Sequence, residues 1–144
     1  MIKKVYSDNE LLAIIIPGDY RRDGIEFFTE NSFSQQLGYM NRKAGYLIEP
    51  HVHNEVKREV DKTQEVLLIR SGTVRVDLYN RDRKYIQSRM LKAGDVILLA
   101  SGGHGFEMVE DTEIIEIKQG PYAGDDDKSH FTGIAGNRVN IVDD

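Results

Sequence analysis

Apolar and polar residues alternate with a period of two along much of this chain, and turn residues interrupt the alternation about every eight to twelve positions. Residues 73–79 show the pattern most clearly, because Val74, Val76 and Leu78 occupy every second position. Successive side chains of a strand point to opposite faces, so these three would share a buried face. Together with short apolar runs that end at turn residues, the pattern predicts strands at residues 11–16, 25–29, 35–41, 45–49, 65–70, 73–79, 85–91, 96–100, 104–109 and 113–118.

Three segments lack a sustained alternation. Residues 1–10 are polar, and we expect a loose N-terminal arm there. Residues 54–64 are the most charged stretch, which predicts a loop beside His53; one or two helical turns are the alternative, because Val56 and Val60 are four residues apart. The chain beyond residue 120 is rich in Gly and Asp, and only residues 138–142 suggest a further, short edge strand.

Many short strands without a long amphipathic helix predict an all-β fold, either a sandwich or a barrel. The chain has 144 residues, which suits a single domain, and it has no strong repeat or linker. We therefore expect one domain in three parts: an N-terminal arm and first strand at residues 1–24, a barrel at 25–120 and an irregular tail at 121–144.

Charge and cysteine content narrow the classes of partner. The net charge of −5 argues against nucleic acid and against anionic membrane surfaces, both of which attract basic patches. The sequence has no cysteine, so a metal would need nitrogen and oxygen ligands. No apolar run approaches the roughly 18 residues of a membrane-spanning helix, and residues 11–16 are too short for the core of a signal peptide. We expect a cytoplasmic protein.

His51 and His53 form an H-x-H pair, and His104 follows about fifty residues later on another predicted strand. Residues i and i+2 of a strand point to the same side, so His51 and His53 could grip one ion. Neutral imidazole binds zinc, copper, iron and nickel. The alternative is a pair of histidines exposed at a strand end.

The spacing around these histidines resembles the first motif of the cupin superfamily. Gly45 is followed after five residues by His51-Val52-His53, and Glu65 is followed after six residues by Gly72. The gap between the two halves is longer than is usual in that family.

The second cupin motif is matched more loosely by residues 94–104, which begin with a glycine and a buried strand and end at His104. Ala100 stands where the family has proline, the corner is one residue short, and the final asparagine is missing. The resemblance covers about residues 30–120. It implies a double-stranded β-helix, or jelly-roll barrel, whose mouth holds one divalent transition metal ion (Mn, Fe, Ni, Cu or Zn) on His51, His53, Glu65 and His104.

The donor set suits such an ion, because three imidazoles and one carboxylate leave coordination positions for water or substrate. Glu65 also shares the inward parity of Leu67 and Ile69, where an unpaired carboxylate would be costly. Glu55 is the alternative acid. An ordinary strand-start carboxylate and a core or surface histidine are the alternatives for Glu65 and His104. His130 has no motif around it, and we expect an exposed acidic turn at residues 125–127.

Three functions remain open. The first is a metal-dependent isomerase, epimerase or lyase that acts on a small polar molecule such as a sugar, with Glu116, Lys118 and Tyr122 as candidate catalytic residues. A Glu116–Lys118 ion pair is the structural alternative. The second is a non-haem iron dioxygenase, and the third is a metal-dependent binding protein without catalysis.

We expect a homodimer, with the strand at residues 11–16 pairing across a twofold axis.

Overall fold

The computed structural model describes residues 1–143, which contain ten β-strands, two short 3₁₀ helices and no α-helix. The strands are β1 (Lys3–Ser7), β2 (Glu10–Ile16), β3 (Gly24–Phe27), β4 (Gly38–Asn41), β5 (Glu65–Ser71), β6 (Thr73–Tyr79), β7 (Tyr85–Lys92), β8 (Val96–Leu99), β9 (Gly103–Met108) and β10 (Glu113–Lys118). The helices are η1 (Gly124–Asp127) and η2 (Gly136–Arg138). None of these helices could cross a bilayer. The predicted all-β class is confirmed.

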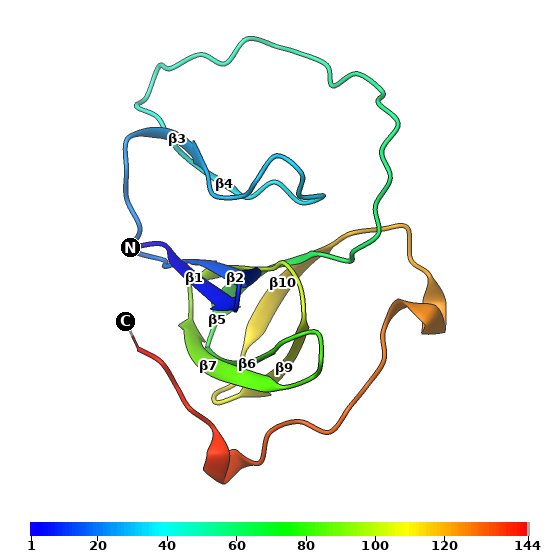
Figure 1. The fold of residues 1–144 in the computed structure, drawn as a ribbon. Helices are drawn as coiled ribbons and strands as arrows, with labels where there is room; N and C mark the ends of the chain where they lie inside the picture. The colour runs from blue at the N-terminus through cyan, green and yellow to red at the C-terminus, as the bar shows by residue number, and fades with distance from the viewer. Residues whose placement is uncertain (144) are drawn as a thin grey trace.

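The strands form three layers (Figure 1). A five-stranded sheet in the order β1-β2-β8-β5-β10 lies against a three-stranded sheet in the order β7-β6-β9. The β3–β4 hairpin lies on the other side of the five-stranded sheet. Within residues 1–143 the sheets pair only antiparallel strands, and none of them closes into a barrel. The structure therefore has most of the predicted strands, in a layered arrangement with open edges.

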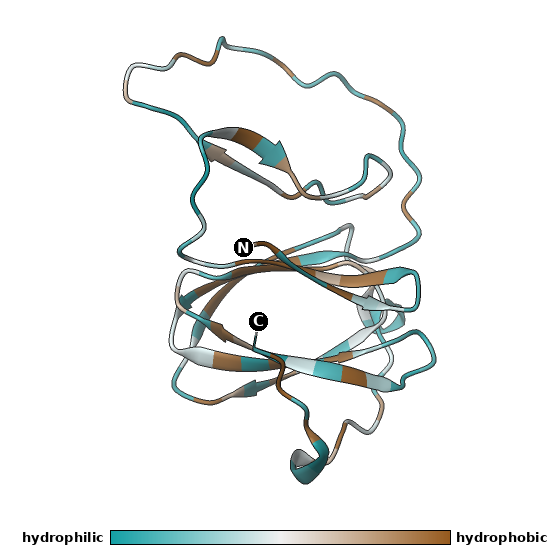
Figure 2. Cartoon of the chain, turned by 60° about the vertical axis from the view of Figure 1, so that its left-hand side comes forward, coloured by the Kyte–Doolittle hydropathy of each residue, from teal (hydrophilic) through white to brown (hydrophobic). Residues whose placement is uncertain are grey.

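The main core lies between the two larger sheets and follows the predicted alternation. Val74, Val76 and Leu78 of β6 are at most 1% exposed and pack against Leu67 and Ile69 of β5. Figure 2 shows apolar positions along the strands of both layers. Removal of this apolar surface from water, at about 25 cal/mol per Å², is the main force that holds the two sheets together.

A second core lies beneath the hairpin, where Phe28 and Leu37 cover Ile14, Ile16 and Leu98. The central strands β2 and β8 are thus covered on both faces. This explains why their sequences are nearly continuous apolar runs rather than alternating ones.

The N-terminal segment differs from the prediction. Lys3–Ser7 is not a loose arm, because it forms β1 and pairs with β2 through a turn at which Asp8 has φ 51°. The other side of β2 pairs with β8. Because both of its edges are occupied, β2 cannot pair across a twofold axis as we predicted.

Residues 42–64 form a long excursion, here called the 42–64 loop, which arches away from the sheets (Figure 1). The predicted strand at 45–49 is absent, and residues 54–64 form a loop as expected rather than a helix. Within residues 42–63 of the described chain, the only backbone–backbone hydrogen bond is local, from Tyr46 N–H to Lys43 C=O. The loop is anchored at its end, where the Gln64 carbonyl accepts from the Gln119 N–H at 3.0 Å.

The C-terminal tail is irregular but folds back onto the sheets (Figure 1). Ile141 makes an isolated parallel bridge with Ser88, which is all that forms of the predicted edge strand at 138–142. The Asn140 N–H donates to the Tyr85 hydroxyl at 2.8 Å and fixes this contact. Asp144, the end of the predicted tail, lies outside the described residues.

Candidate functional site

Glu65 and His104 meet at one end of the interior. Glu65 begins β5 opposite the buried Leu99, and His104 lies near the start of β9 opposite the buried Leu78. Directly paired residues share a face, so both side chains point between the sheets. The His104 Nε2 atom lies 3.4 Å from Oε2 of Glu65, and these side chains are 29% and 16% exposed. We call this the open end, because β9 and β10 are the last strands of their sheets there.

The electrostatic setting favours an ionised Glu65. Its hydrogen-bonding contact with the His104 imidazole lowers the pKa of the Glu65 carboxyl below the ordinary value of 4.5, against the opposing effect of burial. The positive charges of Lys118 and Lys128 lower this pKa further. A partly buried carboxylate is thereby kept charged at neutral pH.

Lys118 brings a cation to the same end. It lies directly opposite Glu65 in the β5–β10 pairing, and its Nζ atom is 3.6 Å from Oδ2 of Asp127. The partner in the structure is therefore Asp127 rather than the Glu116 of our alternative interpretation. Lys118 also lies over the ring of Tyr122 at 5.4 Å, but Tyr122 is 74% exposed.

A cleft of about 850 Å³ takes in Glu65 and His104 and runs along β9 to the C-terminal tail, whereas Lys118 and Tyr122 are not part of its lining. We call it the β9 cleft. Glu65, His104, Phe106 and Glu116 line one part of it. The remaining lining includes Tyr79, Arg81, Arg83, Asp127, Lys128, His130 and Phe131. Its size and mixed polar and aromatic lining suit a small polar molecule.

The structure does not bring His51 and His53 to this cleft. Both are exposed on the 42–64 loop, with their ring centroids 5.2 Å apart. The predicted juxtaposition of these two imidazoles is present, but in another place from Glu65 and His104. Glu55, the alternative acid, is exposed on the same loop. Among residues 1–143 there is no group of three or more His, Asp or Glu residues placed to hold a metal ion.

No protein-family model, curated protein or solved structure matches this chain. The expected cupin relationship has no support from such comparisons.

The tail residues at the cleft have no signal in the sequence. Asp127, Lys128 and His130 line it because the tail folds back, with Phe131 packed on the Tyr79 ring at 5.0 Å. The Ile134 N–H also donates to the Tyr79 hydroxyl at 2.9 Å. From the sequence we expect an exposed acidic turn and find no motif around His130. Their place at the cleft could not be predicted, because composition does not show where an irregular segment lies.

The corner before β9 requires glycine. Gly102 has φ +72°, and a Cβ atom there would lie 2.2 Å from the Tyr79 carbonyl oxygen. No side chain can occupy that space without moving the backbone. This close approach sets where β9 begins and therefore where His104 is placed.

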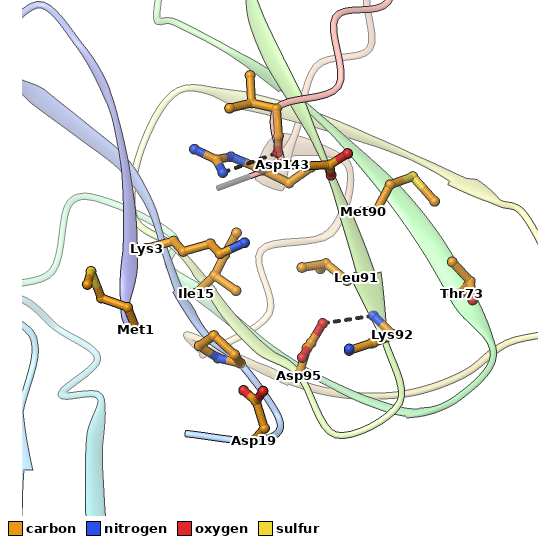
Figure 3. Close-up of a pocket in the computed structure, with 13 residues that line it drawn as sticks. Met1, Lys3, Ile15, Asp19, Thr73, Met90, Leu91, Lys92, Asp95 and Asp143 are labelled. Carbon is orange, nitrogen blue, oxygen red and sulfur yellow. Dashed lines mark hydrogen bonds between the residues drawn. The ribbon is translucent and has the colours of Figure 1, made fainter. Parts of the chain in front are cut away.

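A second cavity of about 510 Å³ lies near β1 and β7, at the other edges of the two sheets (Figure 3). Two of its charged side chains, Asp95 and Arg89, are engaged in the fold. Asp95 accepts from the Lys92 N–H and the Gly18 N–H, both at 2.8 Å, and the Arg89 side chain donates to the Val142 carbonyl at 3.2 Å. We assign these residues a structural role.

Proposed function

We propose that the protein binds a small polar, sugar-like molecule in the β9 cleft and is an isomerase or epimerase that acts by proton transfer. The observation that supports this most strongly is the meeting of a carboxylate, an imidazole and an ammonium group at the open end, in Glu65, His104 and Lys118. Glu65 and His104 line the β9 cleft, and Lys118 lies beside them on β10. Groups of this kind can take a proton from one atom and return it to another.

The roles follow from the charges. Glu65 is ionised at neutral pH and can accept a proton from a carbon next to a carbonyl group, although its lowered pKa makes it a weaker base than an ordinary glutamate. Lys118 can stabilise the negative charge that then develops on the carbonyl oxygen. His104 touches Glu65 and can orient it or exchange the proton with it. Glu116 lines the same cleft and would be the base in protein whose Glu65 and His104 hold a metal ion, because a metal-bound carboxylate cannot accept the proton.

The proposal also includes a cupin-like metal centre, for which four donor side chains would have to come together. The donor types of His51, His53, Glu65 and His104 suit a divalent transition metal, which would polarise a carbonyl or hydroxyl group. Their placement within this single chain does not fit one ion, because only two of the four donors lie at the open end. The donors form two pairs, one on the 42–64 loop and one in the cleft.

The charged groups favour proton transfer over the dioxygenase alternative. An oxygenase of this type needs its ligands gathered around one iron ion, and only two of the four predicted donors lie in this cleft. The cleft instead places Glu116, Asp127 and Lys128 around the Glu65–His104 pair. Such a lining suits a hydroxyl-rich molecule.

Hydrogen exchange tests the proposal even while the product is unidentified. The protein would be incubated in D₂O with a panel of aldoses, ketoses, sugar phosphates and nucleotide sugars, and deuterium incorporation next to the carbonyl would be followed by NMR. We expect incorporation with at least one compound and a loss of about 100-fold in Glu65→Gln and Lys118→Met. Lys84→Met, at an exposed hairpin position, is the matched control. A compound that raises the melting temperature without exchange would instead support a binding protein.

A further inference from the structure

Strand β9 has an unpaired edge at the cleft. It pairs with β6, and among the described residues no strand pairs with its other side. The neighbouring strand β10 is likewise paired with β5 alone in the described part of the chain. Apolar side chains are exposed along both, including Met108 at 51% and Ile117 at 55%. An edge of this kind is a template for an added strand.

The 42–64 loop contains a segment with the matching properties. Leu47 is 80% exposed and Val52 is 86% exposed, as are large parts of Tyr46 and Ile48. Backbone groups of residues 45–53 lack partners within the described chain apart from the local Tyr46 bond and a 2.9 Å contact between the Glu49 carbonyl and the His51 ring. The composition also favours a strand, which is why the sequence predicts one at residues 45–49.

We propose that residues 45–53 of a second copy of this chain add to the free edge of β9 as an antiparallel strand. The loop of the same chain begins at the β3–β4 hairpin, which is anchored on the outer face of the five-stranded sheet. It projects from there, on the side away from the three-stranded sheet that contains β9 (Figure 1). A projecting arm in each copy and a free edge in each copy make a reciprocal, twofold pair.

Parity selects the register. On β9, His104 and Phe106 face the interior, because they lie opposite the buried Leu78 and Val76. In an antiparallel register, the partner copy's residue 53 would lie opposite His104 and its residue 51 opposite Phe106. Both histidines of the added segment would then face inward. This register also places position 52 opposite Gly105, on the outer side of the sheet. That position is open, since a Cβ atom at Gly105 would meet nothing within 4 Å.

This pairing would unite the two halves of the donor set. Each open end would then contain Glu65 and His104 of one copy with the loop histidines of the other. The metal-binding role of these residues rests on the proposed function, whereas the strand pairing does not. The expected homodimer would then be held by exchanged strands rather than by β2.

Crosslinking tests the pairing without reference to metal. Two differently tagged chains, one carrying Val52→Cys and the other Gly105→Cys, would be co-expressed and treated with a short bismaleimide, which tolerates a register shift of two residues. The natural chain has no cysteine, so reaction is confined to these positions. We expect a crosslinked heterodimer by mass spectrometry. Gly136→Cys in place of Gly105→Cys is the matched control, since that position is also open but lies on η2.

Crosslinking confined to single chains of a Val52→Cys/Gly105→Cys double variant would overturn the exchange, because residues 45–53 would then pair with their own β9. Absence of any crosslink between positions 52 and 105 would overturn the strand addition altogether.

Complementation separates failure of the exchange from failure of the metal site. His51→Ala/His53→Ala and Glu65→Gln/His104→Ala chains would be co-expressed with different tags and purified as heterodimers. If donors combine between copies, one of the two sites is complete, and we expect about half the wild-type metal content. Wild-type protein with metal and a heterodimer without it would overturn the exchange. Wild-type protein without metal would overturn the metal site but leave the crosslinking result standing.

Discussion

The Glu65 carboxylate lies in a setting that couples its ionisation to folding. Its contact with His104, and the charges of Lys118 and Lys128, lower its pKa in the folded protein. A group with a lowered folded-state pKa stabilises the fold in its ionised form. That stabilisation is fully present above the unfolded-state pKa, near 4.5, and is lost as the pH falls through the lower, folded-state pKa.

Glu65→Gln should therefore lower the free energy of unfolding by roughly 1 kcal/mol at neutral pH, the scale of a partly buried charged hydrogen bond. The difference in free energy of unfolding between wild type and variant should shrink below about pH 4.5, because protonation of Glu65 removes the same interaction in the wild type. Urea unfolding from about pH 7 to about pH 3.5 measures it. A difference that stays constant over this range would contradict the assignment.

Individual site residues could be predicted only where strand parity and motif spacing agreed. The alternation of the strand predicted that Glu65 faces inward, and the motif spacing predicted that it lies near His104. The structure brings these two side chains together. The same spacing linked His51 and His53 to them, but spacing says nothing about whether a strand finds its partner. Asp127 could not be predicted as the partner of Lys118, because an irregular tail leaves no periodic signal.

At the scale of elements, alternation and short apolar runs predicted β5 to β10 to within one or two residues, because each of these strands packs on a core. The segment at 45–49 has equal strand character but lacks a paired strand within residues 1–143. A strand needs hydrogen-bonded neighbours as well as propensity, so sequence alone could not decide this element. The Asp8 turn that creates β1 was missed for a similar reason, since polar residues at an edge resemble a loop.

The corner before β9 gives an element-scale prediction. Gly102→Ala should lower the free energy of unfolding by about 2–4 kcal/mol, because it combines a positive φ with a clash on the Tyr79 carbonyl. Gly105→Ala, three residues later in open space, should change it by about 0.5 kcal/mol or less. Chemical denaturation of both variants provides the comparison. Equal stability of the two would show that the corner tolerates a side chain.

The whole molecule is a three-layered β structure whose interior is accessible along one side. The hairpin covers the outer face of the five-stranded sheet, and the tail folds over the β9 cleft. The 42–64 loop projects away from the sheets until it is anchored again at Gln64. An all-β single chain could be predicted from composition and pattern. Closure of the sheets into a barrel could not be predicted, because it depends on where the long, charged 42–64 loop places the segments on either side of it.

At this scale our central claim is that Glu65 and His104 mark a ligand site rather than an isolated ion pair. Elemental analysis of freshly purified protein tests it most directly, with wild type, Glu65→Gln, His104→Ala and His130→Ala compared side by side. His130 lines the same cleft but is outside the proposed donor set, which makes it the matched control. We predict about one transition-metal ion per chain in the wild type and in His130→Ala, and a loss of most of it in the other two. Wild-type protein without such an ion, or undiminished metal in Glu65→Gln and His104→Ala, would contradict this account.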